Sequence, residues 1–181
     1  KTIQLNGKND NIVLSKMYFL IVKQGIGNSP SKVDSTFVTY NGSLLNREVF
    51  DSRELPLWFD LTGVIRGFRE FLPYLRAGNH ILNNDGTYDL DNYGQGIFFI
   101  PSGLGYYAQN LLTIPKYSPL VFSVALHKVN PTDHDNDGIL SINEDPDGDG
   151  DPFNDDTDED RIPNYRDPDD DGDGTLTKNE Y

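Results

Sequence analysis

Residues 64–75 read VIRGFREFLPYL, and this stretch decides the fold. Its apolar residues recur at i, i+3, i+7 and i+10 and form one face of a helix: Ile65, Phe68, Leu72 and Leu75. Because proline cannot supply the next backbone donor, Pro73 should end this helix near Leu72. No other segment has comparable spacing, so the sequence predicts one short helix.

Apolar or alternating runs bounded by Gly, Pro and Asn surround the helix, and such runs are typical of β-strands. They lie at 16–23, 35–40, 57–61, 96–101 and 120–129. Residues 79–96 are polar and carry Asn-Asp-Gly at 84–86, which predicts a protruding hairpin or loop. We therefore expect the α+β class, with an antiparallel sheet curled around the helix.

Charge divides the chain into two parts. Residues 133–181 hold 19 of the 29 acidic residues but 3 of the 15 basic ones, which gives a net charge of −16 there and +2 in the rest. The acidic part carries too few apolar side chains to form a core of its own. The sequence thus predicts a compact domain at 1–131 and an acidic segment at 132–181.

Several function classes are excluded by composition. Nucleic-acid binding needs clustered Lys and Arg, and the strong charge run here is acidic. The longest apolar run, 17–22, is too short for a membrane-spanning helix. The absence of cysteine removes thiol catalysis and Cys-ligated zinc. Because the chain starts at Lys1 with neither an initiator Met nor an apolar leader, we expect a processed chain.

An ordered series of short motifs runs through the first part. They are Tyr40-Asn41-Gly42, Val49-Phe50-Asp51-Ser52, Val64-Ile65-Arg66-Gly67-Phe68, Ile100-Pro101 to Tyr106, Ile114-Pro115 and Leu120-Val121-Phe122. In this order and spacing, residues 17–130 resemble the FKBP-type peptidyl-prolyl cis-trans isomerases. The resemblance implies a five- or six-stranded antiparallel sheet around the helix, with a substrate pocket between them.

The resemblance also implies which residues form this catalytic pocket: Tyr40, Phe50, Asp51, Leu57, Phe59, Val64, Ile65, Phe68, Tyr106, Ile114 and Phe122. A dry aromatic pocket suits this reaction, because twisting an X-Pro bond makes the amide less polar. Tyr106 would donate its hydroxyl to the bound peptide, and Asp51 would stand at the pocket edge. No cofactor is required for catalysis.

Two positions depart from the family pattern. Phe68 stands where the family usually has Trp at the pocket floor, and Trp58 is expected on the opposite strand face from Leu57 and Phe59. Tyr107 replaces the usual Gly after Tyr106. These departures bear on turnover and ligand preference more than on the fold.

The acidic segment contains a calcium-loop pattern. Residues 133–144 place acids at positions 1, 3 and 5, Gly at 6, Ser at 9 and Glu at 12, and residues 169–180 repeat this register. Weaker windows start at 145 and 156, the latter with Arg161 where Gly is expected. Such a loop wraps a hard cation in oxygen ligands.

The four windows give the expected structural calcium ligands. These are Asp133, Asp135, Asp137, Ile139 through its carbonyl, Ser141, Glu144, Asp145, Asp147, Asp149, Asp151, Asp156, Asp158, Asp160, Asp167, Asp169, Asp171, Asp173, Thr175, Thr177 and Glu180. The windows adjoin, so no helices fit between them as in paired EF-hands. The spacing instead resembles thrombospondin type-3 repeats, which implies a largely irregular, calcium-wrapped segment.

Together these patterns lead to one functional hypothesis and an alternative. The hypothesis is a prolyl isomerase acting on proline-containing unfolded or exported polypeptides, with macrolide inhibitors as further candidate ligands and the calcium array as stabiliser or spacer. The alternative is a weakly catalytic or non-catalytic binding module with a calcium-dependent adhesion or docking segment. Calcium loops and the N-terminus suggest an extracytoplasmic protein, periplasmic or a surface lipoprotein of a Gram-negative bacterium.

Overall fold

The computed structural model describes residues 1–6, 12–86 and 88–180. One antiparallel sheet dominates it, with strand order β3-β8-β9-β4-β5. The strands are β3 (Tyr18–Lys23), β4 (Ser35–Leu44), β5 (Val49–Asp60), β8 (Gly94–Ile100) and β9 (Leu120–Asn130). All five predicted strand regions are confirmed, with β4 and β5 longer than their apolar runs indicated.

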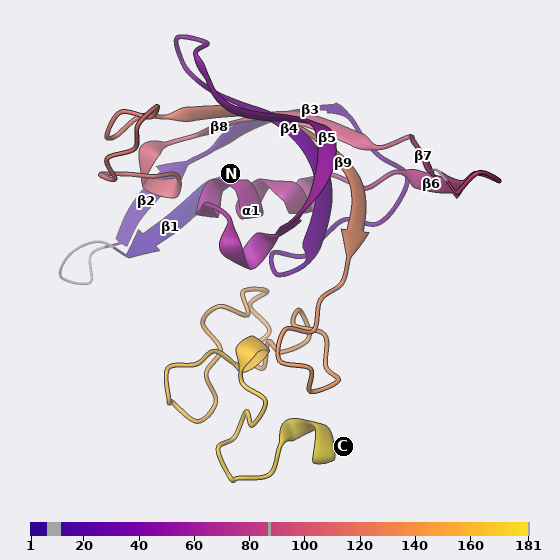
Figure 1. The fold of residues 1–181 in the computed structure, drawn as a ribbon. Helices are drawn as coiled ribbons and strands as arrows, with labels where there is room; N and C mark the ends of the chain where they lie inside the picture. The colour runs from indigo at the N-terminus through magenta and orange to yellow at the C-terminus, as the bar shows by residue number, and fades with distance from the viewer. Residues whose placement is uncertain (7–11, 87, 181) are drawn as a thin grey trace.

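The helix lies in the curve of this sheet (Figure 1). α1 spans Arg66–Phe71 and passes into a short 3-10 helix, η3, at Leu72–Tyr74. The predicted end near Leu72 is confirmed, because Pro73 lies inside the tighter turn of η3. Gly67 allows a close approach to the sheet, since a Cβ at this position would lie 2.5 Å from Ile100 Cγ2.

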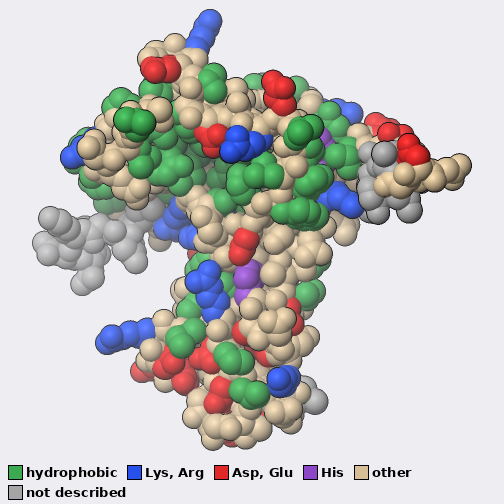
Figure 2. All heavy atoms as spheres, in the orientation of Figure 1, with side chains coloured by type: hydrophobic (Ala, Val, Ile, Leu, Met, Phe, Trp, Pro, Cys, Tyr) green, Lys and Arg blue, Asp and Glu red, His purple; other side chains and the backbone are tan. Residues whose placement is uncertain are grey.

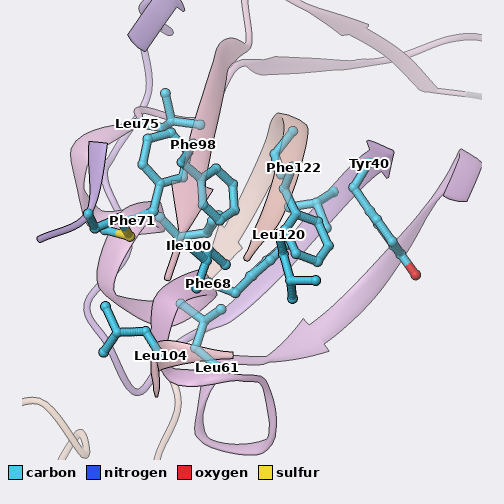
Figure 3. Close-up of a cluster of buried hydrophobic side chains, with 14 of the residues drawn as sticks. Tyr40, Leu61, Phe68, Phe71, Leu75, Phe98, Ile100, Leu104, Leu120 and Phe122 are labelled. Atoms are coloured by element: carbon cyan, nitrogen blue, oxygen red, sulfur yellow. The ribbon is translucent and has the colours of Figure 1, made fainter. Parts of the chain in front are cut away.

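The core fills the space between α1 and the sheet (Figure 3). Phe71 and Phe98 stack at 4.2 Å between ring centroids, and Phe98 and Phe122 stack at 5.4 Å. Phe68 meets both Phe98 and Phe122 edge-on. Such aromatic pairs add stabilisation beyond the area that they bury. This packing holds the face of α1 that points toward β4 and β9 in a fixed position.

Two small hairpins flank the main sheet. β1 (Thr2–Asn6) pairs with β2 (Ile12–Lys16), and β6 (Asn79–Leu82) pairs with β7 (Tyr88–Asp91). The second is the hairpin predicted at 79–96. The first was not predicted; it places Ile3 in the core, and Lys1 Nζ lies 2.7 Å from the buried Glu70 carboxylate. Short 3-10 helices η2 (Leu61–Gly63) and η4 (Ser102–Leu104) lie in the connecting loops.

The C-terminal segment leaves the sheet at the end of β9 and forms a separate lobe of irregular chain (Figure 1). Its regular elements among the described residues are the 3-10 helices η5 (Asn164–Arg166) and η6 (Thr177–Asn179). Among the described residues, no helix is long and apolar enough to cross a membrane.

Specific contacts attach this segment to the domain beside α1. The Arg69 guanidinium lies 3.8 Å from the centroid of the Phe153 ring, within cation-π range. Lys32 Nζ lies 3.4 Å from an oxygen of Asp151, and His134 Nε2 lies 3.3 Å from Asp60 Oδ2. Asp60 begins the turn η2, which leads directly into α1. The segment therefore packs against the elements that support the concave side of the sheet.

Candidate active site and candidate metal centre

A cavity of about 440 Å³ opens between α1 and the strands β4, β5 and β9. Its lining is mainly apolar and aromatic: Tyr40, Phe50, Asp51, Arg53, Leu57, Phe59, Gly63, Val64, Ile65, Phe68, Tyr106 and Phe122. Ten of the eleven residues expected from the sequence thus line one hollow. The exception is Ile114, which is buried in the core but does not line the cavity. The walls come from four separate parts of the chain.

Alternation along β5 decides which side chains face this cavity. Leu57 and Phe59 pack toward the core, whereas Trp58 lies on the outer face, half exposed, with its ring centroid 5.1 Å from that of Phe37. The predicted placement of Trp58 away from the cavity is confirmed. A second hollow, of about 520 Å³, lies on that outer face and is lined largely by polar residues of the sheet.

Phe68 forms the floor of the cavity. It is 3% exposed, and its ring meets Tyr40, Phe59 and Phe122 edge-on, with centroid separations between 5.5 and 6.4 Å. The surrounding aromatic rings fix this side chain in one orientation. A phenyl ring at this position closes the bottom of the hollow without a polar group, so the floor offers no hydrogen-bonding group to a ligand.

The polar groups stand at the cavity edge. The Tyr40 hydroxyl donates to Asp51 Oδ2 at 2.5 Å, and Figure 3 shows this hydroxyl directed away from the apolar cluster. Burial and the hydrogen bond to Asp51 raise the pKa of Tyr40 to about 12. Arg53 Nη1 lies 4.0 Å from Asp51 Oδ1, and both side chains are about half exposed, so this ion pair contributes little stability.

Tyr106 is the remaining polar group of the lining. It is partly buried against the core, and burial together with the charge of Asp51 raises its pKa. Within the described ranges of the chain its hydroxyl has no hydrogen-bond partner, so it is available to donate to a ligand in the cavity. The next residue, Tyr107, has a φ of +48°, which explains why a Gly would fit there and why Tyr carries some strain.

The acidic segment consists of four loops of the same construction, starting at 133, 145, 156 and 169. The backbone N–H at position 6 donates to the carboxylate at position 1 in every loop. Positions 4 and 6 have positive φ in all four. Arg161, at position 6 of the third loop, adopts φ +81° where the others have Gly. The weaker windows therefore share the geometry of the complete ones.

Each loop gathers its first three acidic side chains. In all four loops the carboxylates at positions 1, 3 and 5 have oxygens within 4.8 Å of one another: Asp133, Asp135 and Asp137; Asp145, Asp147 and Asp149; Asp156, Asp158 and Asp160; Asp169, Asp171 and Asp173. In Figure 2 the acidic side chains collect on the lower lobe, which this segment forms. This spacing allows three oxygens to reach one ion.

The remaining expected ligands are placed in different ways. The residues at position 7, Ile139, Asp151 and Thr175, each donate their N–H to the position 5 carboxylate. Ser141 and Thr177, at position 9, accept hydrogen bonds from the position 2 N–H of their own loops. Their hydroxyls therefore hold the loops closed, and their expected role as cation ligands stays a prediction.

The residues expected at the closing position 12 of the loops differ in how deeply they are buried. Glu144 is 4% exposed and Asp167 is buried, whereas Glu180 is exposed. Asp155, which the sequence windows did not single out, is buried, and burial together with the charges of Asp147 and Asp145 raises its pKa. Asp156 instead begins the third loop. Asp155 therefore lies near the second loop, whereas the closing role expected for Asp156 stays a prediction.

Buried carboxylate oxygens without partners mark where a cation fits. Both oxygens of Glu144, and Oδ2 of Asp137 and of Asp155, are buried with no hydrogen-bond partner in the described ranges. Burial and the charges of Asp135 and Asp137 raise the pKa of Glu144 to about 8. Uncompensated buried charge is costly unless a cation neutralises it. The donors are all oxygens, which suits calcium.

Comparisons with known proteins give separate matches for the acidic segment and for the rest of the chain. Residues 134–181 match the family described as BamM C-terminal. This match gives no support to the thrombospondin type-3 resemblance, so the calcium hypothesis depends on the loops themselves.

The first part is similar to prolyl isomerases. It is 34% identical over 119 residues to the probable FKBP-type peptidyl-prolyl cis-trans isomerase FkpA of Neisseria meningitidis, covering 64% of this chain and 38% of that protein. It is 31% identical over 135 residues to the FKBP-type 22 kDa peptidyl-prolyl cis-trans isomerase of Escherichia coli, covering 71% and 58%. The chain thus spans between about a third and three fifths of these relatives.

Solved structures agree. The crystal structure of FkpA from Escherichia coli matches with a TM-score of 0.53 and 32% identity, over 64% of this chain and 48% of that one. A peptidyl-prolyl cis-trans isomerase from Pseudomonas syringae matches with a TM-score of 0.53 at 23% identity, over 70% and 80%, which shows the shared fold. These relatives and structures support the FKBP-type peptidyl-prolyl isomerase family for the N-terminal domain.

Proposed function

We propose that residues 1–131 catalyse the cis-trans isomerisation of X-Pro bonds in proline-containing polypeptides. The observation that carries this proposal is the aromatic cavity itself, with ten of the predicted residues around one hollow. At its edge lies the Tyr106 hydroxyl, which has no hydrogen-bond partner among the described residues. The curated relatives that are named for this activity support the assignment.

The chemistry requires no proton transfer and no cofactor. Rotation about an X-Pro bond has a barrier of about 18–20 kcal/mol, because twisting removes amide resonance. In the twisted state the carbonyl and the nitrogen share less charge, so the amide loses less on leaving water. A cavity floored by Phe68 and walled by Phe59 and Phe122 therefore favours the twisted form over the planar one.

The polar groups at the edge hold the substrate. In this proposal, Tyr106 donates a hydrogen bond to a carbonyl of the bound peptide and fixes the chain while the prolyl bond turns. Asp51, held by the Tyr40 hydroxyl, stands beside the twisting carbonyl. Residues that only wall the cavity contribute by excluding water.

Replacement of Tyr106 by Phe tests the role of its hydroxyl, with the same replacement at the neighbouring Tyr107 as control. Tyr106→Phe should lower kcat/KM about 3- to 10-fold, the value of one neutral hydrogen bond, in a protease-coupled proline-peptide assay. Tyr107→Phe is the matched control, because Tyr107 is 60% exposed and does not line the cavity. Its activity should equal that of the wild type.

A cavity variant completes the test. Phe59→Ala should reduce kcat/KM further by opening the wall. If the wild type and all variants isomerise the peptide at the uncatalysed rate, the alternative of a binding module replaces the enzymatic proposal.

We propose also that residues 132–181 form a unit that binds calcium, one ion in each loop, as a structural metal. The proposed core ligands are the carboxylates at positions 1, 3 and 5 and the position 7 carbonyl of each loop, together with the closing carboxylates, of which Glu144 is buried and Glu180 exposed. The hydroxyls of Ser141 and Thr177 hold their loops closed. Calorimetric titration of chelator-treated protein with CaCl₂ should show tight binding of several equivalents, and flat heats would refute it.

Calcium loops of this kind fill where calcium is abundant, so we also propose an extracytoplasmic location, periplasmic or on a surface lipoprotein, with exported polypeptides as substrates. The related FkpA proteins of Escherichia coli and Neisseria meningitidis come from Gram-negative bacteria. Macrolide inhibitors are proposed ligands of the same cavity. Fractionation of the native host, followed by immunodetection of the protein, tests the location; recovery in the cytoplasmic fraction would contradict it.

A further inference from the structure

Three carboxylates from the two ends of the acidic segment converge. Oxygens of Asp137, Glu144 and Asp170 lie within 4.8 Å of one another. Asp137 and Glu144 are positions 5 and 12 of the first loop, whereas Asp170 is position 2 of the fourth. A calcium-loop pattern assigns no ligand to position 2, so the pattern does not single out Asp170.

These three carboxylates have buried oxygens whose charge is not offset by hydrogen bonds or by a basic side chain in the described parts of the chain. Glu144 and Asp137 are 4% and 5% exposed, and both oxygens of Glu144, Oδ2 of Asp137 and Oδ1 of Asp170 have no hydrogen-bond partner within residues 1–6, 12–86 and 88–180. In the same ranges, no Lys or Arg forms an ion pair with any of the three. Carboxylates brought this close repel each other unless a cation lies between them.

The first loop has room for a ligand from outside. Asp133, Asp135, Asp137, the Ile139 carbonyl and a bidentate Glu144 supply six oxygens, whereas calcium takes six to eight. Position 9, which in such loops often acts through a water, is occupied otherwise. Its Ser141 hydroxyl accepts from His134 N and bonds His134 Nδ1 at 2.8 Å.

We propose that Asp170 is a ligand of the cation held by the first loop, so that one ion joins the start and the end of the segment. This inference rests on the proposed calcium binding. The fourth loop is thereby held against the first, next to the point where His134 contacts Asp60 of the domain. Filling of the first site and folding of the fourth loop should then be coupled.

Calorimetric titration with CaCl₂ of the full chain and of single and double variants tests this site. Asp170→Asn should weaken one site at least about tenfold. Glu159→Gln is the matched control: it removes one negative charge at an exposed position outside the groups of converging carboxylates, and it should leave every site unchanged. A double-mutant cycle identifies the affected site.

In the cycle, Asp170→Asn and Glu144→Gln should be strongly non-additive, since either removes the same ion. Asp170→Asn and Asp149→Asn, a change in the second loop, should add. Stability supplies a second readout. Without calcium, Asp170→Asn should make the segment more resistant to protease, because a repelling charge is gone. With calcium, the same substitution should make the segment less resistant, because a ligand of the ion is lost. A merely misfolded variant would be less resistant in both.

Two results would overturn the inference. If Asp170→Asn matches Glu159→Gln, or couples to Asp149 rather than to Glu144, the shared site is refuted while calcium binding stands. If the wild-type chain binds no calcium, both proposals fail together.

Discussion

The domain and the acidic segment bury opposite kinds of side chain. The core of the domain is built from aromatic and aliphatic groups such as Phe68, Phe71 and Phe98. In the described part of the segment, Pro152 and Tyr165 are the buried apolar residues, and the other buried residues are polar or acidic: Asp137, Ser141, Glu144, Asp155, Asn164, Asp167 and Thr177. The first is stabilised by removal of apolar surface from water, whereas the second lacks that driving force and needs an ion.

Removal of calcium should produce the largest difference in protease resistance between the two regions. With chelator, residues 133–181 should become accessible to protease, because the carboxylates of each loop then repel one another without compensation. The domain should stay intact, since its core contains no cation site. Limited proteolysis with mass spectrometry checks both parts. Equal digestion with and without chelator would contradict the calcium-dependent half of the comparison.

Truncation of Phe68 should have the converse effect. Phe68→Ala removes a buried ring from the centre of the aromatic cluster and should lower the free energy of unfolding of the domain by about 3–5 kcal/mol. Calcium binding by the segment should hardly change. Denaturant unfolding combined with calcium titration measures both quantities.

Trp58→Ala is the control for this variant, because Trp58 is half exposed on the outer face of the sheet. Trp58→Ala should lower the free energy of unfolding by about 1 kcal/mol or less. Equal losses from the two variants would mean that the ring stacking around Phe68 is not what holds the domain.

A smaller effect is expected at the third loop. Arg161 has φ +81°, and Arg161→Gly should stabilise the calcium-bound segment by about 0.5–1 kcal/mol, the left-handed strain less the entropy that Gly adds to the unfolded chain. The calcium concentration at which half of the protein resists protease measures this stabilisation, and it should be lower for the variant.

Gly174→Ala provides the opposite change at φ +90°. A Cβ there would meet no atom within 4 Å, so its effect reports backbone strain alone. It should shift the midpoint to higher calcium. A shift of both variants in one direction would show that strain at position 6 does not limit loop closure.

Much of the fold follows from short-range pattern. The spacing of Ile65, Phe68 and Leu72 located the helix, and alternation around Trp58 assigned the faces of β5, because both periods are properties of the local backbone. The hairpin of β1 and β2 was missed, since its apolar residues form only short runs around a polar stretch at 6–11 and the burial of Ile3 depends on contact with the domain.

The candidate sites divide in the same way. The order of motifs predicted ten of the residues that line the cavity. Ile114 is instead buried in the core, and its position depends on contacts between segments that are distant in the sequence. The 1-3-5-6 register predicted four loops. It could not show that Asp155 is buried near Asp145 and Asp147.

By itself the sequence determined which residues form a helix, which strand faces are apolar and where each acidic loop begins, because these depend on spacing along one stretch of chain. The tertiary structure alone decided that Asp170 meets Glu144, and that the segment rests beside α1 through Arg69 and Phe153. Contacts between distant segments are set by packing and by charge balance in three dimensions, which no local period records.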